Sequence, residues 1–291
     1  MPHPVRPFPA LALLGFMDEA AAVQFASGMF ITRARTPAGI VRLWRSHANA
    51  VAHLAPWTSA DTPTLSPPDP ALAPYLASVE ADPLFAATYP AGTWSFAEVE
   101  IANLLAFQPH VEIGRYEVTP GAAGLASAGD RARFTLPVAV AEPMVVFEER
   151  DGAGRSVGVS YSSSRPNLLF TGFQGQPPQP GLFAFQVTPR PNFAAVARYQ
   201  NRLYVHNGYH RLVSLLRMGF DTATVVMRDV VTWGEVAPPG QGLFSETLMV
   251  TSPRPPMLRD FGDTTLAHTG RVRPVLSILR VSYSEQRIPM V

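Results

Sequence analysis

A short run of residues in the second half of the chain has the residue types and spacing of an anion-binding turn. Asn207 and Gly208 form a common turn pair, and a helical pattern begins at the next residues, Tyr209, His210 and Arg211. Backbone N–H groups in the first turn of a helix have no partner within the helix, and the helix dipole adds positive potential there. We therefore expect these five residues to bind a phosphate group.

Two side chains of this turn can add chemistry to the backbone. The planar guanidinium of Arg211 has donors that suit phosphate oxygens, and His210 can donate a hydrogen bond or move a proton near neutral pH. Between Asn192 and Arg228 there are five arginines against Asp221 alone, a local excess of +4, whereas the whole chain has a formal net charge of +1. Positive charge is thus concentrated in the segment that holds the turn.

A purely structural role is the alternative to anion binding for the turn residues and the nearby histidines. Asn-Gly is the commonest hairpin turn, and His206 and His210 can be partly buried side chains that bond to backbone carbonyls. A metal site at these two histidines is disfavoured, because His206 precedes the predicted helix and no acidic or cysteine ligand is close in sequence. We expect no metal, and the structural role stays open beside anion binding.

The elements that must position the turn are predicted within residues 192–237, a stretch without proline in a chain that has 30 prolines. Residues 203–206 have the pattern of a strand, and residues 209–218 have that of a helix with leucines facing inward. Gly219 suits the C-cap, and residues 222–227 predict a second strand. The turn is therefore expected inside a compact strand, helix and strand unit.

This unit resembles the nucleotide-binding box of the ParB/sulfiredoxin superfamily. The resemblance is strongest at residues 203–228, which begin LYVHNGYHRL, and weaker at residues 94–111, which resemble the first strand and the segment after it. It implies an α+β fold, namely a ParB/sulfiredoxin-like mixed α/β domain over residues 92–291. Residues 111–191 would then be a β-rich insertion.

The resemblance also implies a ligand, a nucleoside triphosphate such as ATP or CTP with magnesium, whose phosphates lie over the start of the helix. Members of the superfamily include CTP-dependent DNA clamps, nucleotide-dependent kinases of small substrates and sulfinic-acid reductases. By this resemblance, the nucleotide-binding residues are Asn207, Gly208, Tyr209, His210 and Arg211.

Two catalytic residues of the superfamily are replaced in this chain. Tyr209 stands where sulfiredoxins have the catalytic cysteine, and Asn207 stands where small-substrate kinases have an aspartate. Any catalysis would then depend on His210 or on a carboxylate of the predicted first strand, Glu98 or Glu100, and we take His210 and Glu100 as the candidate catalytic residues. Whether the protein is an enzyme stays open, but neither sulfinic-acid reduction nor phosphorylation of free serine is expected.

The N-terminal part is expected to form separate regions. Residues 1–56 are predicted to be helical, with helices at 17–27 and 36–55, and this region is a candidate surface for a protein partner. Residues 57–91 are predicted to be a proline-rich linker with a short helix, because the stretch from Pro56 to Pro74, both included, contains six prolines.

The insertion is expected to be rich in strands. Residues 144–150 and 155–161 flank the turn sequence Asp-Gly-Ala-Gly and predict a hairpin. A short strand is expected near 183–187, and strand-like pieces occur at 99–101 and 111–118.

The composition excludes several classes of site and partner. The chain has no cysteine, which excludes disulfides, thiolate zinc sites and cysteine nucleophiles, and it has no lysine, which excludes Walker-type nucleotide binding and Schiff-base catalysis. The longest apolar run, residues 7–17, is too short to span a bilayer, so no membrane association is expected. The near-neutral charge makes DNA an unfavoured partner, and a chain without cysteine and lysine fits a bacterial protein of the cytoplasm.

Two functions follow as hypotheses. The first is a nucleotide- or phosphate-ligand-binding protein of ParB/sulfiredoxin-like type, with nucleotide-dependent activity left open. The alternative is a non-catalytic module that keeps the fold and uses its surface to bind a protein or DNA.

Overall fold

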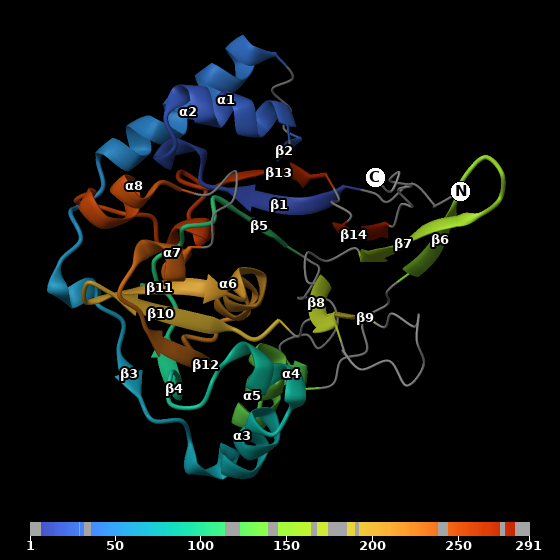
Figure 1. The fold of residues 1–291 in the computed structure, drawn as a ribbon. Helices are drawn as coiled ribbons and strands as arrows, with labels where there is room; N and C mark the ends of the chain where they lie inside the picture. The colour runs from blue at the N-terminus through green and yellow to red at the C-terminus, as the bar shows by residue number, and fades with distance from the viewer. Residues whose placement is uncertain are drawn as a thin grey trace. The chain divides into compact units, whose positions relative to one another are not determined.

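A computed structural model describes residues 7–28, 30–31, 36–113, 123–138, 145–163, 168–173, 185–189, 192–237, 244–273 and 277–282 (Figure 1). The chain forms two compact units, of which the first comprises residues 1–138 and 192–273 and the second comprises residues 139–191 and 274–291. All helices of the described ranges belong to the first unit, and the second unit contributes strands. The fold is therefore α+β.

The first unit contains two sheets and their covering helices. Its elements are β1 (Phe8–Ala12), α1 (Glu19–Gly28), β2 (Phe30–Ile31), α2 (Pro37–Ala52), β3 (Leu65–Ser66), α3 (Ala73–Glu80), α4 (Pro83–Thr88), β4 (Ser95–Glu100), β5 (His110–Glu112), α5 (Ala128–Thr135), β10 (Ala195–Tyr199), β11 (Arg202–Asn207), α6 (Tyr209–Arg217), β12 (Thr222–Asp229), α7 (Trp233–Val236), α8 (Glu246–Thr251) and β13 (His268–Val272). Short 3₁₀ helices lie at Leu14–Phe16, Ser59–Asp61, Pro70–Leu72, Ala123–Leu125 and Leu258–Gly262.

The central sheet has the strand order β11-β10-β12-β4-β3. Strand β10 is parallel to β12 and antiparallel to β11, whereas β4 is antiparallel to both of its neighbours. Alternate residues of a strand point to opposite faces, so Val99 and Val225 pack with the leucines of α6, while Phe96 and Val226 pack with α3, α4 and α5. Figure 1 shows these three helices gathered beside β4 and β12.

The second sheet of this unit has the order β2-β13-β1-β5, and all of its pairs are antiparallel. Strand β1 is central, so the apolar run at residues 7–17 contributes a buried strand. Ala10 and Ala12 of this strand pack in one core cluster with Phe25 and Phe30 from the α1 and β2 region. Across the described residues, no helix combines the length and apolar character needed to cross a membrane.

The predicted helices form where their start and stop signals lie. Thr36 caps α2 by accepting a hydrogen bond from Gly39 N at 3.1 Å, and Pro37 occupies the first turn. Gly219 adopts a φ of +86° just after α6, where a residue without Cβ ends a helix at low cost. The predicted short helix is confirmed as α3, and the strands at 203–206 and 222–227 are confirmed as β11 and β12.

Residues 57–91 belong to the first unit, which differs from the expected linker. Strand β3 pairs with β4, Trp57 N donates to Pro253 O at 2.6 Å, and Arg259 forms an ion pair with Asp61 at 2.8 Å. Three helices of this segment have proline in the first two positions, where a missing N–H breaks no helical hydrogen bond. Three of the prolines, Pro70, Pro74 and Pro83, therefore lie at the start of short helices.

The boundaries of the insertion also differ from the expected ones. Helix α5 lies within residues 111–191 yet belongs to the first unit, and residues 274–291 belong to the second unit because β14 pairs with β7. The second unit has the sheet β14-β7-β6 and the pair β8-β9. Its strands are β6 (Val145–Arg150), β7 (Ser156–Ser163), β8 (Leu168–Phe173), β9 (Phe185–Pro189) and β14 (Ser277–Ser282).

The predicted hairpin is confirmed as β6 and β7, and the strand expected near 183–187 is found as β9. The strand expected at 111–118 overlaps β5, which ends at Glu112, and its remainder from residue 114 lies outside the described ranges.

Gly208→Ala should destabilise the first unit more than Gly219→Ala. Both glycines have positive φ, of +88° and +86°, but a Cβ at Gly208 would lie 2.7 Å from Ala194 Cα, whereas a Cβ at Gly219 meets nothing within 4 Å. Backbone strain alone costs about 1–2 kcal/mol, and the contact adds roughly 1–3 kcal/mol at Gly208. Chemical denaturation measures the free energy of unfolding of both variants. Gly234→Ala is the control, because Gly234 has neither a positive φ nor a close neighbour at the position of an added Cβ. Equal losses at the two glycines would show that the contact with Ala194 is unimportant.

Candidate functional site

The expected turn joins β11 to α6, as the sequence predicts. Asn207 Oδ1 accepts a hydrogen bond from Gly208 N at 2.9 Å, and Gly208 occupies the left-handed region at the N-cap of α6. The N–H groups of Arg211 and Leu212 both donate to Gly208 O at 3.0 Å, which closes the first turn. The backbone therefore reverses sharply at Gly208, and the start of α6 lies at the end of the central sheet.

The side chains of Tyr209 and Arg211 are buried. The Tyr209 hydroxyl donates to Val205 O at 2.6 Å and accepts from Phe107 N at 3.1 Å, and burial raises the pKa of Tyr209 well above its usual value. The Arg211 guanidinium donates to Asn192 O. A residue near the N-terminus of a helix does not necessarily direct its side chain toward that end. The direction depends on the position of the residue around the helix. The Arg211 donors that were expected to bind phosphate thus have a backbone acceptor.

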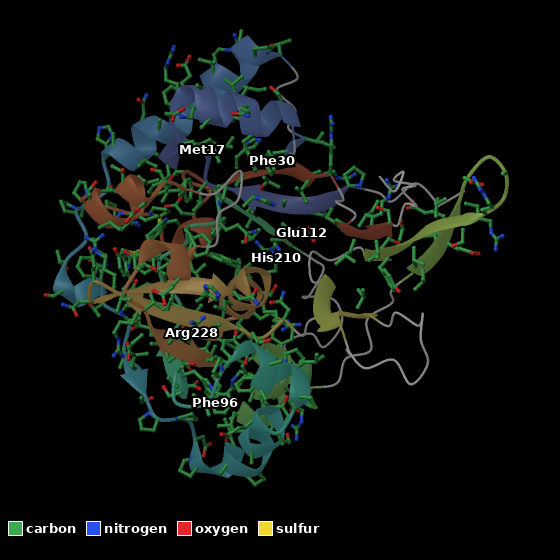
Figure 2. All side chains as sticks on the ribbon, viewed as in Figure 1. Met17, Phe30, Phe96, Glu112, His210 and Arg228 are labelled. Atoms are coloured by element: carbon green, nitrogen blue, oxygen red, sulfur yellow. The ribbon has the colours of Figure 1, made fainter. Side chains whose placement is uncertain are left out.

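His210 is held by strand β5. Its Nδ1 accepts a hydrogen bond from Glu112 N at 3.0 Å, which places the proton of the neutral ring on Nε2. Figure 2 shows His210 and Glu112 next to each other. His210 O also accepts from the Ser214 hydroxyl at 2.7 Å within α6. The His210 ring is therefore fixed in a tautomer that can donate a hydrogen bond from Nε2.

A second histidine, His110, is the first residue of β5, the strand that binds His210. No sequence pattern indicated a role for it. Its Nδ1 is buried and has no hydrogen-bond partner among the described residues. Burial and, to a lesser extent, His210 lower the pKa of His110 to about 4, and Glu112 acts in the opposite direction. The ring of Phe25 lies 5.4 Å from the His110 ring. An uncharged imidazole whose Nδ1 has no partner among the described residues is thus buried next to Phe25, two residues before the Glu112 N–H that binds His210.

The segment that connects β4 to β5, the strand of His110, runs along β11. Leu105 N donates to Leu203 O, and Val205 N donates to Leu105 O, both at 2.9 Å, so this segment runs along β11. Two residues later, Phe107 binds the Tyr209 hydroxyl, and β5 follows. Residues 94–111, which carry the weaker resemblance, therefore lie against the strand and helix that carry the stronger one.

His110 also belongs to a row of histidines on the second sheet. His110 and His268 both pair with Ala12 from opposite sides, so the two rings share one face of the sheet. The His268 ring lies 5.6 Å from that of His47, and the pKa of His268 is lowered to about 4 by burial and by His47. Within the described ranges, no group of three or more acidic or histidine side chains is placed to hold a metal ion.

The structure does not bring Glu100 and His210 together. Glu100 pairs with Thr222 at the start of β12, beyond the C-terminal end of α6, whereas His210 lies in the first turn of that helix. One oxygen of Glu100 accepts hydrogen bonds from Thr64 N and Oγ1 at 3.3 and 3.4 Å. The two candidate catalytic residues therefore cannot act on the same atoms in this arrangement.

His206 and the local arginines also have structural partners. His206 Nδ1 bonds to Val236 O at 2.8 Å, and burial lowers its pKa. Arg198 forms an ion pair at 3.2 Å with Asp229, one residue beyond the segment counted as basic, and Arg202 donates to Met249 O at 3.0 Å. The local positive excess is consequently spread over the sheet and is not focused on the turn.

Comparison of the chain with protein-family models, with curated proteins and with solved structures gives no match.

His110→Phe should reduce the loss of stability on acidification. The pKa of His110 is about 4 in the fold and about 6.5 in an unfolded chain, so the unfolded state binds the proton first as the pH falls. The stability linked to His110 is therefore complete above pH 6.5 and decreases between about pH 6.5 and 4, by roughly 1.4 kcal/mol per pH unit. The measurement is the free energy of unfolding at several pH values.

The control for this experiment is His53→Gln, because His53 is exposed. His268 titrates in the same window, so the slope should become smaller in His110→Phe without vanishing. The same slope in both variants would contradict the burial of a neutral His110.

Proposed function

We propose that the start of α6, together with His110 and His210, binds a phosphate-bearing ligand, and that this ligand is a nucleotide, ATP or CTP with magnesium. The observation that carries the proposal is the buried His110 Nδ1, which has no hydrogen-bond partner among the described residues and belongs to the residue two positions before Glu112, whose N–H binds His210 at the start of α6. Buried polar groups normally have a partner, and a ligand oxygen would supply one.

The electrostatics of the turn support an anion. The first turn of α6 contains no acidic residue, so the positive end of the helix dipole is uncompensated within the helix. His210 adds an Nε2 donor, because Glu112 N occupies its Nδ1. The Glu112 carboxylate lies close enough to affect the pKa of His110, and a magnesium ion bound to the phosphates would offset its charge.

The arrangement of strands supports a ParB/sulfiredoxin-like domain as part of the proposal. Strand β4 pairs with β12 in the central sheet. Leu105, in the segment between β4 and β5, is hydrogen-bonded to β11 at the edge of the same sheet. The segment from β4 to β5 and the unit from β11 to β12 are the two parts of the sequence that resemble the superfamily.

Binding without catalysis is the function that this site supports best. Asn207 has no carboxylate, and the Tyr209 hydroxyl is hydrogen-bonded to Val205 O and Phe107 N. Glu100 lies beyond the other end of α6. The Nδ1 atom of His210 accepts a hydrogen bond from Glu112 N and is therefore not available as a base. We therefore expect neither sulfinic-acid reductase activity nor phosphorylation of free serine.

Calorimetric titration with ATP, CTP and GTP, each with and without magnesium, tests this proposal. Saturable binding is expected for at least one of them, and His210→Ala should weaken it by about tenfold or more, because a hydrogen bond to a charged group contributes roughly 1.5–3 kcal/mol. Arg217→Ala is the matched control, since it removes a positive charge from the exposed last turn of the same helix. Absence of binding at millimolar nucleotide, or equal affinity of both variants, would refute the site.

A second candidate function is that of a non-catalytic interaction module, and one observation favours it. Val145, Val146 and Phe147 of β6 are each at least half exposed, and Ile278 of β14 is 60% exposed. These strands are the two outer strands of the described three-stranded sheet. Exposed apolar side chains of this kind mark surfaces that bind other proteins. The same titration separates the two functions, because this module predicts no saturable nucleotide binding.

A further inference from the structure

A row of polar side chains crosses three strands on the face of the central sheet that α3, α4 and α5 cover. Glu98 of β4 pairs with Ser66 of β3 on one side and with Thr224 of β12 on the other, so the three side chains share one face. Their neighbours on the same face, Phe96 and Val226, belong to the apolar cluster under the helices. The row therefore begins where the apolar core of this face ends.

A hollow of about 290 Å³ lies over this row. Besides the three side chains of the row, its walls include Asp69 and Leu72, which precede α3, and Arg131, which belongs to α5. At about 30 Å³ per water molecule, the hollow has room for on the order of ten waters or a small organic molecule. It is too small for a nucleoside triphosphate, so it is distinct in kind from the site proposed at α6.

The hollow carries more negative than positive charge. Glu98 accepts a hydrogen bond from the Thr224 hydroxyl at 2.8 Å, and Asp69 accepts one from Ala71 N at 2.9 Å. Within the described part of the chain, neither carboxylate has a cation at ion-pair distance. A second oxygen of each carboxylate is thus available to a donor from a ligand.

Arg131 does not neutralise these carboxylates directly. Its guanidinium donates to Leu125 O at 3.1 Å and to Ala126 O at 2.9 Å, and it lies 5.2 Å from the centre of the Phe220 ring. These contacts hold the guanidinium against α5 and the chain before it. Arg131 keeps its positive charge, so Glu98, Asp69 and Arg131 together give the wall of the hollow a net charge of −1, which still favours a cation over an anion.

We propose that this hollow binds a small organic cation with hydrogen-bond donors, an aliphatic amine or guanidinium compound. Its ammonium or guanidinium N–H groups donate to Glu98 and Asp69, and its carbon chain contacts Leu72. A divalent metal ion fits less well, because no described group of three acidic or histidine ligands occurs here and the hollow is much larger than an ion. This inference does not depend on nucleotide binding at α6.

Calorimetric titration of the full chain with agmatine and putrescine tests the proposal, with succinate as an anion of similar length. We expect saturable binding of at least one cation and none of succinate. Glu98→Gln keeps the size of the side chain and removes its charge, and it should weaken binding at least tenfold. Glu80→Gln is the matched control, because Glu80 is an exposed glutamate at the end of α3 outside the hollow.

Thermal unfolding and nucleotide titration of each variant show whether the fold and the α6 site are intact. Asp69→Asn provides a second test should Glu98→Gln fail to fold, and it should weaken the same ligand. The proposal is overturned if neither cation binds at millimolar concentration, if succinate binds as well as the cations, or if the folded variants bind like the unmodified chain.

Discussion

The close approach of Gly208 to Ala194 is the constraint on which the site depends. At Gly208 the chain leaves β11 and enters α6, and it does so with a φ of +88° while Ala194 lies where a Cβ would be. Only glycine meets both conditions without strain. Because this turn sets where α6 begins, it also sets the positions of the Tyr209 hydroxyl, which binds Phe107, and of His210, which binds β5.

The burial of neutral histidines connects this turn to the second sheet. Strand β5 binds His210 of α6 through Glu112 N, and its His110 shares a sheet face with His268; burial lowers the pKa of both histidines to about 4. Neutral imidazoles allow strands β1, β5 and β13 to pack under α1 and α2 without buried charge. The same burial leaves the Nδ1 atom of His110 without a partner among the described residues.

Local signals were sufficient for the strand, turn and helix unit, and for the helices with clear caps. The Asn207 and Gly208 pair, the leucine spacing and Gly219 predict β11, α6 and β12 because these signals act within a few residues. The role of His110 depends on β5 meeting α6, and the buried direction of Arg211 depends on how that helix packs. Both are set by tertiary contacts that periodicity does not encode. The prediction of a linker before α3 is wrong for a related reason, since proline is favoured in the first turn of a helix as well as in linkers.

We propose that the start of α6 and His110 receive a phosphate-bearing ligand. Titration with tripolyphosphate and magnesium, followed by NMR of the backbone amide and histidine ring signals, tests this proposal. The largest shifts are expected at the amides of residues 208–211 and at the rings of His110 and His210. Shifts confined to other parts of the chain, such as the last turn of α6, or no shifts at millimolar ligand, would contradict it.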